Sequence, residues 1–454
     1  MIKVYGDGLD ALITINLLLK SGREVEHYSK TELRGGHFRG SENCGSSFDL
    51  GMVLLEQDFS LDKTNDLTEY AGEFGQNSRA YLSEVYEWLE SKVGKLENHS
   101  VYVELISGEM ISDYFISDSF EFIKCMDEEN KSKLKDRLVN AMKFSALGGE
   151  LHPSLKTKSQ IATVTPLVDV LQISFGHDLY RDYFKPFIEK LSGSENPLIA
   201  AKDNRRVWMP NFYPESILWA IGEEKMYENF KIEPVQFSRP TKMQIAEFVR
   251  MIDAENQSDI RYFQKEYDET ISSYDMKAKD TISFCNLYDF TKLQKDNYDF
   301  IWNFSGYFDN PEYSLSNFLD VTHYCVLDCK PRTVFVLNGQ TQAIRYSFYK
   351  SEKNSTFSIE STCGEKSGQE VGIEVLNSLG IQRTCEGYTK RVPIKVMKTP
   401  FNLEEWSDFC AQVQLHFKNF NQGLFLIHPE ANNFNDNLLR GLAAFRKREK
   451  IACD

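Results

Sequence analysis

Small residues near the start of the chain have the spacing of a turn that holds a pyrophosphate. Gly6 and Gly8 follow the short apolar segment 2–5, and Ala11 stands at the third small position. In such a turn the first glycine permits a tight bend and the second lets the backbone approach the phosphates, while the third small residue lets a helix pack closely on a strand. The helix that follows offers unpaired backbone N–H groups to an anion. The pattern therefore predicts that this turn binds a dinucleotide.

The segments around these glycines have the order that the turn requires. Residues 2–5 (IKVY) favour a strand, and residues 9–20 (LDALITINLLLK) carry apolar side chains at helical spacing. Ser21 and Gly22 predict the end of that helix, and residues 23–28 (REVEHY) are again extended in character. Strand, glycine turn, helix and second strand together predict a βαβ unit.

Three polar residues depart from the usual pattern of this unit. An acidic residue normally closes the second strand and accepts hydrogen bonds from the ribose hydroxyls, whereas this chain has Ser29 there. A serine makes such a bond without the assistance of charge, so Ser29→Glu is expected to tighten binding. Asp7 and Asp10 stabilise the start of the helix, yet they compete with a phosphate for its positive end. A structural βαβ unit that has lost its nucleotide is therefore an alternative interpretation.

The segment 29–37 resembles the second FAD motif of flavin amine oxidases and protoporphyrinogen-oxidase-like proteins. That motif has an acid, five residues, two glycines and usually an arginine; this chain has Ser29, five residues, Gly35 and Gly36, and then His37. In those families the paired glycines let the chain cross beneath the pyrophosphate. The resemblance implies the same role for the paired glycines here.

Later segments resemble the same families in a consistent order. The stretch 46–56 (SSFDLGMVLLE) is similar to one that leads towards the flavin, and 175–193 is similar to a helical segment shared with UDP-galactopyranose mutases. An aromatic-Tyr-Pro turn opening a helix is expected in 207–221. The stretch 297–306 resembles a strand that re-enters the nucleotide domain, and 344–362 resembles a strand pair of the substrate sheet.

The last segment, 423–448, resembles a closing block made of a strand, a turn at the flavin, and a helix whose N-terminus faces the ring. Asn435 or Asp436 is the expected N-cap of that helix. The packed face is expected to carry Leu438, Leu439 and Leu442.

The resemblance implies an FAD site and names its residues. Cofactor contacts are expected from Gly6, Gly8, Leu9, Ala11, Ser29, Arg34, Gly35, Gly36, His37, His428 and Asn437. Three of them depart from the motif, because Ser29, His37 and His428 stand where an acid, an arginine and a glycine are usual. No catalytic residue is nominated, since hydride transfer to a flavin needs little from the protein beyond orientation and a dry cleft.

The implied fold class is α/β, with a Rossmann-like FAD-binding domain that is interleaved with a substrate domain of a mixed sheet and helices. The FAD-binding domain is expected to be discontinuous and to comprise residues 1–60, 205–240, 296–308 and 400–454. The substrate domain is expected to comprise residues 61–204, 241–295 and 309–399.

Composition restricts the partners and the compartment. The net charge of −15 argues against nucleic acid, because phosphate binding needs a positive field. The longest apolar run, 11–19, is too short to insert into a membrane, and no basic segment precedes it as in a secretion signal. The nine cysteines are scattered and odd in number, which favours reduced thiols in the cytoplasm. Cys325, Cys329 and His323 lack a second pair that would complete a tetrahedral metal site, so buried thiols on a strand are expected instead.

Three functions stay open. The first is an FAD-dependent oxidoreductase of the amine-oxidase or protoporphyrinogen-oxidase-like group that oxidises a C–N or C–C bond of a small molecule. The second is a UDP-sugar pyranose mutase-like flavoenzyme, which needs a reduced flavin and an arginine pair for the diphosphate; Arg205 and Arg206 are the adjacent candidates. The third is a flavin-free scaffold or binding protein of the same fold, favoured by the three departures. The sequence also leaves a homo-oligomer open.

Overall fold

The computed structural model describes two long continuous stretches of the second half, most of the first hundred residues and several shorter segments. The described residues are 1–29, 31–43, 45–56, 86–112, 121–146, 166–195, 199, 214–222, 225–226, 237–257, 261–263, 281–286, 299–303, 314–350, 355–397, 434, 437–438, 441–442, 444–446 and 448.

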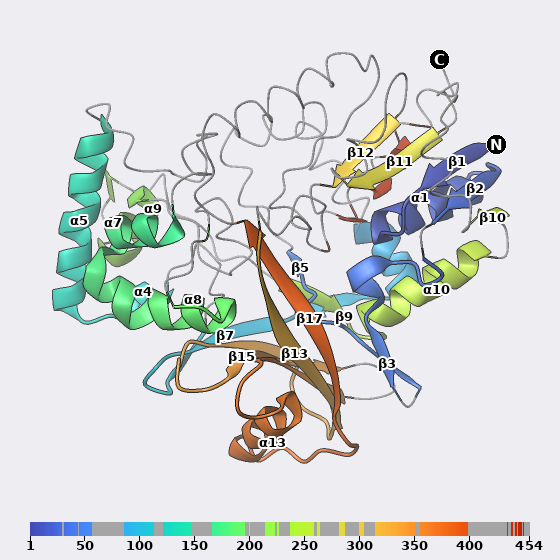
Figure 1. The fold of residues 1–454 in the computed structure, drawn as a ribbon. Helices are drawn as coiled ribbons and strands as arrows, with labels where there is room; N and C mark the ends of the chain where they lie inside the picture. The colour runs from blue at the N-terminus through green and yellow to red at the C-terminus, as the bar shows by residue number, and fades with distance from the viewer. Residues whose placement is uncertain are drawn as a thin grey trace.

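A five-stranded sheet near the N-terminus is parallel throughout, and it lies to the right in Figure 1. Its strand order is β10-β2-β1-β11-β12. The bounds are β1 (Ile2–Tyr5), β2 (Val25–Tyr28), β10 (Arg261–Phe263), β11 (Thr281–Asn286) and β12 (Asp299–Asn303). The chain runs outward from β1 first to one side and then to the other, which is the order of a doubly wound sheet with its switch point at β1.

Helix α1 (Leu9–Lys20) connects β1 to β2, so the predicted βαβ unit is confirmed. Nearly all of its first ten side chains are buried, because the helix packs on the sheet and also against α10 (Ile245–Gln257). It ends where the sequence predicts. Gly22 has φ +79°, and the N–H of Arg23 donates to the carbonyl of Leu18 at 3.0 Å.

A second, seven-stranded mixed sheet has the order β17-β13-β16-β15-β14-β7-β8. Its strands β7 and β14 are parallel and its other neighbours antiparallel. The bounds are β7 (Ser100–Glu104), β8 (Met110–Ile111), β13 (Ser314–Val326), β14 (Arg332–Val336), β15 (Ala343–Lys350), β16 (Ser355–Thr362) and β17 (Tyr388–Met397). The strand pair predicted in 344–362 is confirmed by β15 and β16.

The two faces of this sheet are covered differently. Helix α13 (Gly368–Ser378) lies below the sheet in Figure 1 and packs on the aromatic side chains of Tyr324, Tyr346 and Phe357. It begins with a capping box, in which Ser367 and Glu370 each accept a hydrogen bond from the other's backbone N–H. The opposite face packs on the helical layer through side chains of β7, β13, β14 and β15.

The helical layer lies on the left in Figure 1 and shares one apolar core with β7, β14 and β15. Its elements are α4 (Glu121–Lys124), α5 (Glu128–Ala146), α7 (Leu167–Leu179), η3 (Tyr180–Phe184), α8 (Lys185–Ser192) and α9 (Pro214–Gly222). The helical segment predicted in 175–193 is confirmed, with a kink at Gly176, whose φ is +86°. No described helix has both the length and the apolar character needed to cross a bilayer.

Short strands join the two main sheets. β3 (Ser41–Asn43) and β4 (Ser46–Phe48) form a hairpin. β9 (Phe237–Pro240) pairs on its two sides with β5 (Leu55–Glu56) and β6 (Leu96–Asn98).

The structure differs from the predicted domain division in two places. Helix α10 and strands β10 and β11 lie within 241–295, which was assigned to the substrate domain, yet they pack on α1 or pair within the parallel sheet. Helix α9 lies within 205–240, which was assigned to the FAD-binding domain, yet its buried side chains belong to the core of the helical layer. Strand β12 is in the parallel sheet, as 297–306 predicted. Elsewhere the division stays a prediction.

Candidate functional site

The glycine turn follows the carboxyl end of β1 and is hydrogen-bonded to the last residue of β2. Gly6 has φ +138°, and its N–H donates to the carbonyl of Tyr28 at 3.0 Å. Gly8 is the N-cap of α1 and brings no side chain over the helix end. Leu9 and Ala11 are buried, Ala11 in the core between the helix and the sheet. The predicted small residues therefore stand at the start of a helix, where backbone N–H groups point outward.

Asp10 occupies part of this helix end. Its Oδ1 accepts a hydrogen bond from the N–H of Ala11 at 3.0 Å, and a Cβ on Gly8 would overlap that oxygen. The carboxylate is buried. One of the N–H groups expected to bind an anion is therefore already bonded within the protein.

Ser29 lies directly after β2, is fully buried, and donates a hydrogen bond to the carboxylate of Asp7. Asp7 stands between the two glycines of the turn, so turn and strand end are joined by side chains as well as by backbone. His27 supports the turn from β2, with Nε2 at 2.8 Å from the carbonyl of Gly6. Burial lowers the pKa of His27 to about 4, so the neutral ring donates this bond at pH 7.

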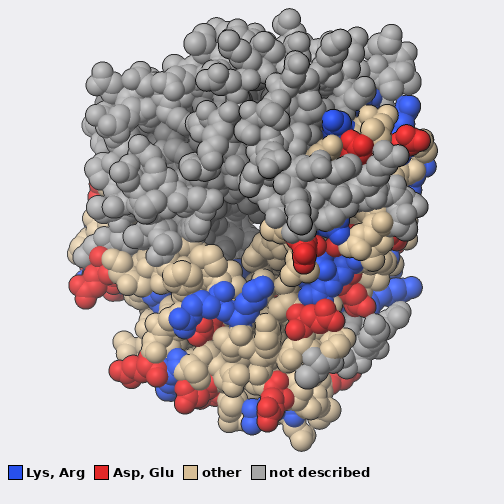
Figure 2. All heavy atoms as spheres, turned by 45° about the vertical axis from the view of Figure 1, so that its right-hand side comes forward, with Lys and Arg blue, Asp and Glu red and all other residues tan. Residues whose placement is uncertain are grey.

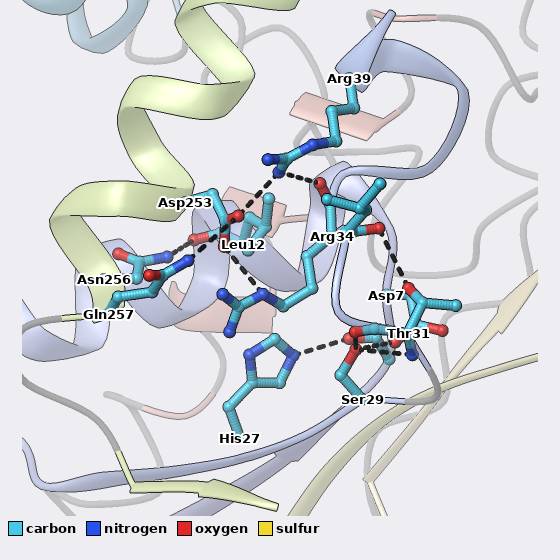
Figure 3. Close-up of polar contacts among 12 residues, drawn as sticks. Asp7, Leu12, His27, Ser29, Thr31, Arg34, Arg39, Asp253, Asn256 and Gln257 are labelled. Atoms are coloured by element: carbon cyan, nitrogen blue, oxygen red, sulfur yellow. Dashed lines mark hydrogen bonds and ion pairs between the residues drawn. The ribbon is translucent and has the colours of Figure 1, made fainter. Parts of the chain in front are cut away.

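Arg34 and Arg39 pair with one buried carboxylate on α10 (Figure 3). Arg34 Nε lies 2.9 Å from Asp253 Oδ1, and Arg39 Nη1 lies 2.7 Å from Asp253 Oδ2. Asp253 is 2% exposed. The cofactor contact of Arg34 stays a prediction; the partner on α10, 219 positions along the chain, had no signal in the sequence.

The two glycines of the second motif differ in their surroundings. A Cβ on Gly35 would overlap Val249 on α10 and lie 3.5 Å from a methyl group of Leu12, and Gly35 has φ +103°. Gly36 is exposed and has φ +56°, and a Cβ there would meet no atom of the described residues within 4 Å. Gly35 thus packs on the helices, whereas Gly36 does not.

His37 connects this segment to the second sheet. Its side chain is exposed, and its ring bonds the carbonyl of Leu50. Although solvent reaches the side chain, the protein packed around it disfavours the charged ring and lowers the pKa of His37, and the nearby carboxylates of Glu360 and Asp49 oppose that shift. The paired-glycine segment, the FDLG stretch and β16 therefore meet at this histidine.

The sheet face that meets this region is polar and buried. Val321 pairs with both Lys390 and Glu360, and Glu360 pairs with Arg345, so these residues form one row across four strands. The next row is formed by His323, Ser358, Ser347 and Thr333. Directly paired residues point to the same face of a sheet. All of these polar residues except Lys390 are buried.

Arg345 and Glu360 form a bidentate ion pair on this face. Arg345 Nη2 lies 2.6 Å and 2.7 Å from the two carboxylate oxygens, and Nε lies 2.9 Å from Oε1. Gly51 approaches the pair so closely that a Cβ there would lie 3.2 Å from Glu360 Oε1. The pair therefore lies directly beside the FDLG stretch.

His323 lies in the second row and stacks on Phe48 of β4, with ring centroids 4.9 Å apart. Burial lowers the pKa of His323 to about 3, which keeps the ring neutral. Two hydrogen bonds extend this row: one joins His99 Nε2 and Thr333 Oγ1 at 2.9 Å, and the other joins Thr333 Oγ1 and Ser347 Oγ at 2.8 Å.

Asp49 holds the FDLG stretch to α10. Its Oδ1 accepts a hydrogen bond from the N–H of Ala246 at 2.6 Å, in the first turn of the helix, and its Oδ2 pairs with Arg239. Arg239 also donates to Gln244 Oε1 at 2.7 Å and stacks on the Tyr349 ring at 3.6 Å. The sequence pattern gave no functional role to any of these residues, although Asp49 lies within the FDLG motif.

The described residues of the closing segment 423–448 pack on α1. Leu438 and Leu442 are buried, as predicted, and Thr14 Oγ1 donates to the carbonyl of Gly441 at 3.0 Å. Asn437 is also buried. His428, the N-cap candidates Asn435 and Asp436, and Leu439 lie outside the described residues.

Metal ligands do not gather in the described part of the chain, where no three His, Cys, Asp or Glu side chains come together. Cys325 lies in β13 and is half-buried, as is Cys329 beyond it, and both are free thiols. On the face in Figure 2, acidic and basic side chains of the described residues lie interspersed.

Comparison with known proteins identifies the fold. No protein-family model and no curated protein sequence matches the chain. Among solved structures, reduced UDP-galactopyranose mutase superposes with a TM-score of 0.56 at 14% identity, over 100% of this chain and 94% of that one. The chain has the fold of UDP-galactopyranose mutase. The resemblance stated from the sequence is therefore confirmed at the level of the fold.

Two further solved structures align over the whole chain with lower scores. Putrescine oxidase bound to putrescine has a TM-score of 0.49 at 12% identity, covering 100% of this chain and 98% of that one. The CLA-producing fatty acid isomerase from P. acnes has a TM-score of 0.49 at 10% identity, with the same coverage.

Proposed function

We propose that the chain is an FAD-dependent oxidoreductase that oxidises a C–N or C–C bond of a small molecule. The proposal rests on one observation: the glycine segments of the parallel sheet lie beside the polar face of the seven-stranded sheet. The glycine turn and paired-glycine segment of a doubly wound sheet reach, through His37 and Gly51, the buried polar face of the second sheet. Ligands of doubly wound sheets bind at the carboxyl ends of the strands, beside the switch point.

The residues present fit FAD. Gly8 adds no side chain of its own to the α1 N-terminus, part of which Asp10 occupies, and Gly36 is exposed, so a pyrophosphate can approach the backbone at Gly36 and at the rest of the helix end. FAD supplies the electron transfer itself. The protein's own part is to bind and orient the substrate in a site from which water is excluded. The polar rows on β13, β15 and β16 supply fixed donors and acceptors for that purpose.

A sugar-nucleotide mutase is the second candidate. The fold match to reduced UDP-galactopyranose mutase favours it, as does the placement of the exposed Lys390 in the row of the polar face that carries the Arg345–Glu360 pair, where a cation suits a diphosphate. Arg205 and Arg206, the pair considered from the sequence, lie outside the described residues. The two candidates differ in one respect: an oxidoreductase substrate bleaches oxidised flavin, whereas a mutase turns over only after the flavin is reduced.

The absorption spectrum of the purified protein tests the proposal. We expect flavin bands in the visible range, or their perturbation when FAD is titrated into the protein, and release of FAD on denaturation. Anaerobic addition of amines or other reduced small molecules then distinguishes the two enzymes. A colourless protein that takes up no FAD would instead be a cofactor-free scaffold, in line with the helix N–H that Asp10 already occupies.

The paired glycines should respond to substitution in different ways. Gly36→Val is expected to stay folded with a loss of about 1–3 kcal/mol from its positive φ of +56°, and to lose most FAD binding, because the side chain would enter space that no described residue occupies. Gly35→Ala is expected to lose about 2–4 kcal/mol of stability, since strain at positive φ adds to overlap with Val249. Circular dichroism melting and FAD titration check both; a Gly36→Val protein that binds FAD normally would place the pyrophosphate elsewhere.

A further inference from the structure

We propose that Asp7, held by Ser29, provides the carboxylate that accepts hydrogen bonds from the ribose hydroxyls of the cofactor's adenosine. In this chain the acid therefore lies in the glycine turn rather than at the end of the second strand, where the usual motif has it. The inference rests on the proposed function, because it assigns residues to the nucleotide of that same site.

The position of Asp7 is fixed on several sides. Its backbone carbonyl accepts a hydrogen bond from the N–H of Gly35 at 2.7 Å. The preceding residue, Gly6, is bonded through its N–H to Tyr28 and through its carbonyl to His27. The Asp7 peptide is therefore clamped between the end of β2 and the paired-glycine segment.

This clamp directs the Asp7 carboxylate to the place where the usual acid would stand. Ser29 directly follows β2, and its hydroxyl bonds the carboxylate of Asp7, as Figure 3 shows for the group of residues around the turn. In doubly wound folds the acid at the end of the second strand bonds the ribose. Here the strand end carries a neutral hydroxyl, and the charge lies beside it on the turn.

The chemistry of the pair suits a diol. An ionised carboxylate has about four acceptor sites, so a carboxylate bonded by Ser29 is of a kind that accepts from more than one hydroxyl at a time. The Ser29 oxygen also accepts a hydrogen bond from the backbone N–H of Thr31 at 3.3 Å, which helps to fix its orientation. Asp10 has a different role, because its carboxylate accepts a hydrogen bond from the N–H of Ala11 at the start of α1.

The pair reverses one expectation from the sequence. Ser29→Glu was expected to tighten binding by restoring the missing acid. With Asp7 in contact with Ser29, a glutamate there would place two carboxylates together, and like charges at such a distance oppose each other. We therefore expect Ser29→Glu to weaken FAD binding.

Competition experiments with nucleotides test the inference. ADP and 2′,3′-dideoxy-ADP are used to displace FAD from the wild-type protein, Asp7→Asn, Ser29→Ala and the matched control Glu32→Gln, an exposed acid three positions after Ser29. The wild type should prefer ADP by about tenfold or more, the effect of a hydrogen bond to a charged acceptor. Asp7→Asn should reduce that ratio towards one, Ser29→Ala should reduce it in part, and Glu32→Gln should leave it unchanged.

The ratio is used because removing a negative charge near the phosphates changes the affinity of both nucleotides alike. If the wild type binds FAD and prefers ADP while Asp7→Asn and Ser29→Ala keep the full preference, the inference is wrong and the proposed function stands. A wild type that binds FAD without preferring ADP also overturns it. Absence of FAD binding to the wild type contradicts the proposed function itself. Should Asp7→Asn fail to fold, Ser29→Ala and Ser29→Glu still decide.

Discussion

Asp49→Ala is expected to lower the free energy of unfolding by about 3–5 kcal/mol, the cost of leaving a buried charge without its partner. Asp49 is 2% exposed and Arg239 is 5% exposed, so the guanidinium of Arg239 would remain in the interior with only neutral acceptors. The substitution also removes the acceptor for the N–H of Ala246 at the start of α10. Chemical denaturation monitored by circular dichroism measures the loss.

An exposed ion pair provides the control for this experiment. Asp328 pairs with Lys350 at 2.8 Å, and both side chains are more than half exposed. Asp328→Ala should therefore change stability by less than about 1 kcal/mol. If Asp49→Ala cost no more than the control, Asp49 would not be what joins the FDLG stretch to α10.

The first βαβ unit could be predicted because its signals are local. Gly8 and Gly22 each act within a few residues of their own position, and the apolar side chains of residues 9–20 follow the helix that contains them. The strand pair β15 and β16 was accessible for a similar reason, since polar and apolar residues alternate along both strands and define the two faces.

The membership of the parallel sheet was harder to predict, because strand pairing is decided by contacts distant in sequence. Strand β11 pairs with β1 across more than 270 positions, and α10 is placed by packing against α1 rather than by a motif. The sequence division therefore assigned 241–295 to the substrate domain. Short strands such as β10, with three residues, carry too little pattern to indicate their sheet.

The candidate site shows the same limit. Asp7, Ser29 and Arg34 were recognised from spacing, but their partners were not, because a side-chain contact depends on rotamer and tertiary position. From spacing alone, Ser29 fills the position where the motif usually has a carboxylate. In the structure, the carboxylate of Asp7 contacts Ser29. The structure likewise gives Arg34 the carboxylate of Asp253, which no local motif connects to it.

Separating Arg345 from Glu360 should be as costly as removing Asp49. Glu360→Gln leaves the buried guanidinium without its counter-charge, and Arg345→Met leaves the buried carboxylate alone; we expect each to cost about 3–5 kcal/mol of stability. The double variant Arg345→Met with Glu360→Leu should regain most of that loss, because replacing both charges removes their desolvation penalty together. Free energies of unfolding of the wild type, Arg345→Met, Glu360→Leu and the double variant give the coupling between the two residues.

The double variant also distinguishes structural from functional use of the pair. Because the pair lies beside Gly51 on the polar sheet face, a substrate bound there would meet its charges. If the pair serves the substrate, the stable double variant should bind FAD normally and yet lose turnover or substrate affinity. Unchanged turnover would show that the charges only hold β15 and β16 in register. If the double variant were as unstable as the single ones, the loss would come from packing, and the ion pair would not account for it.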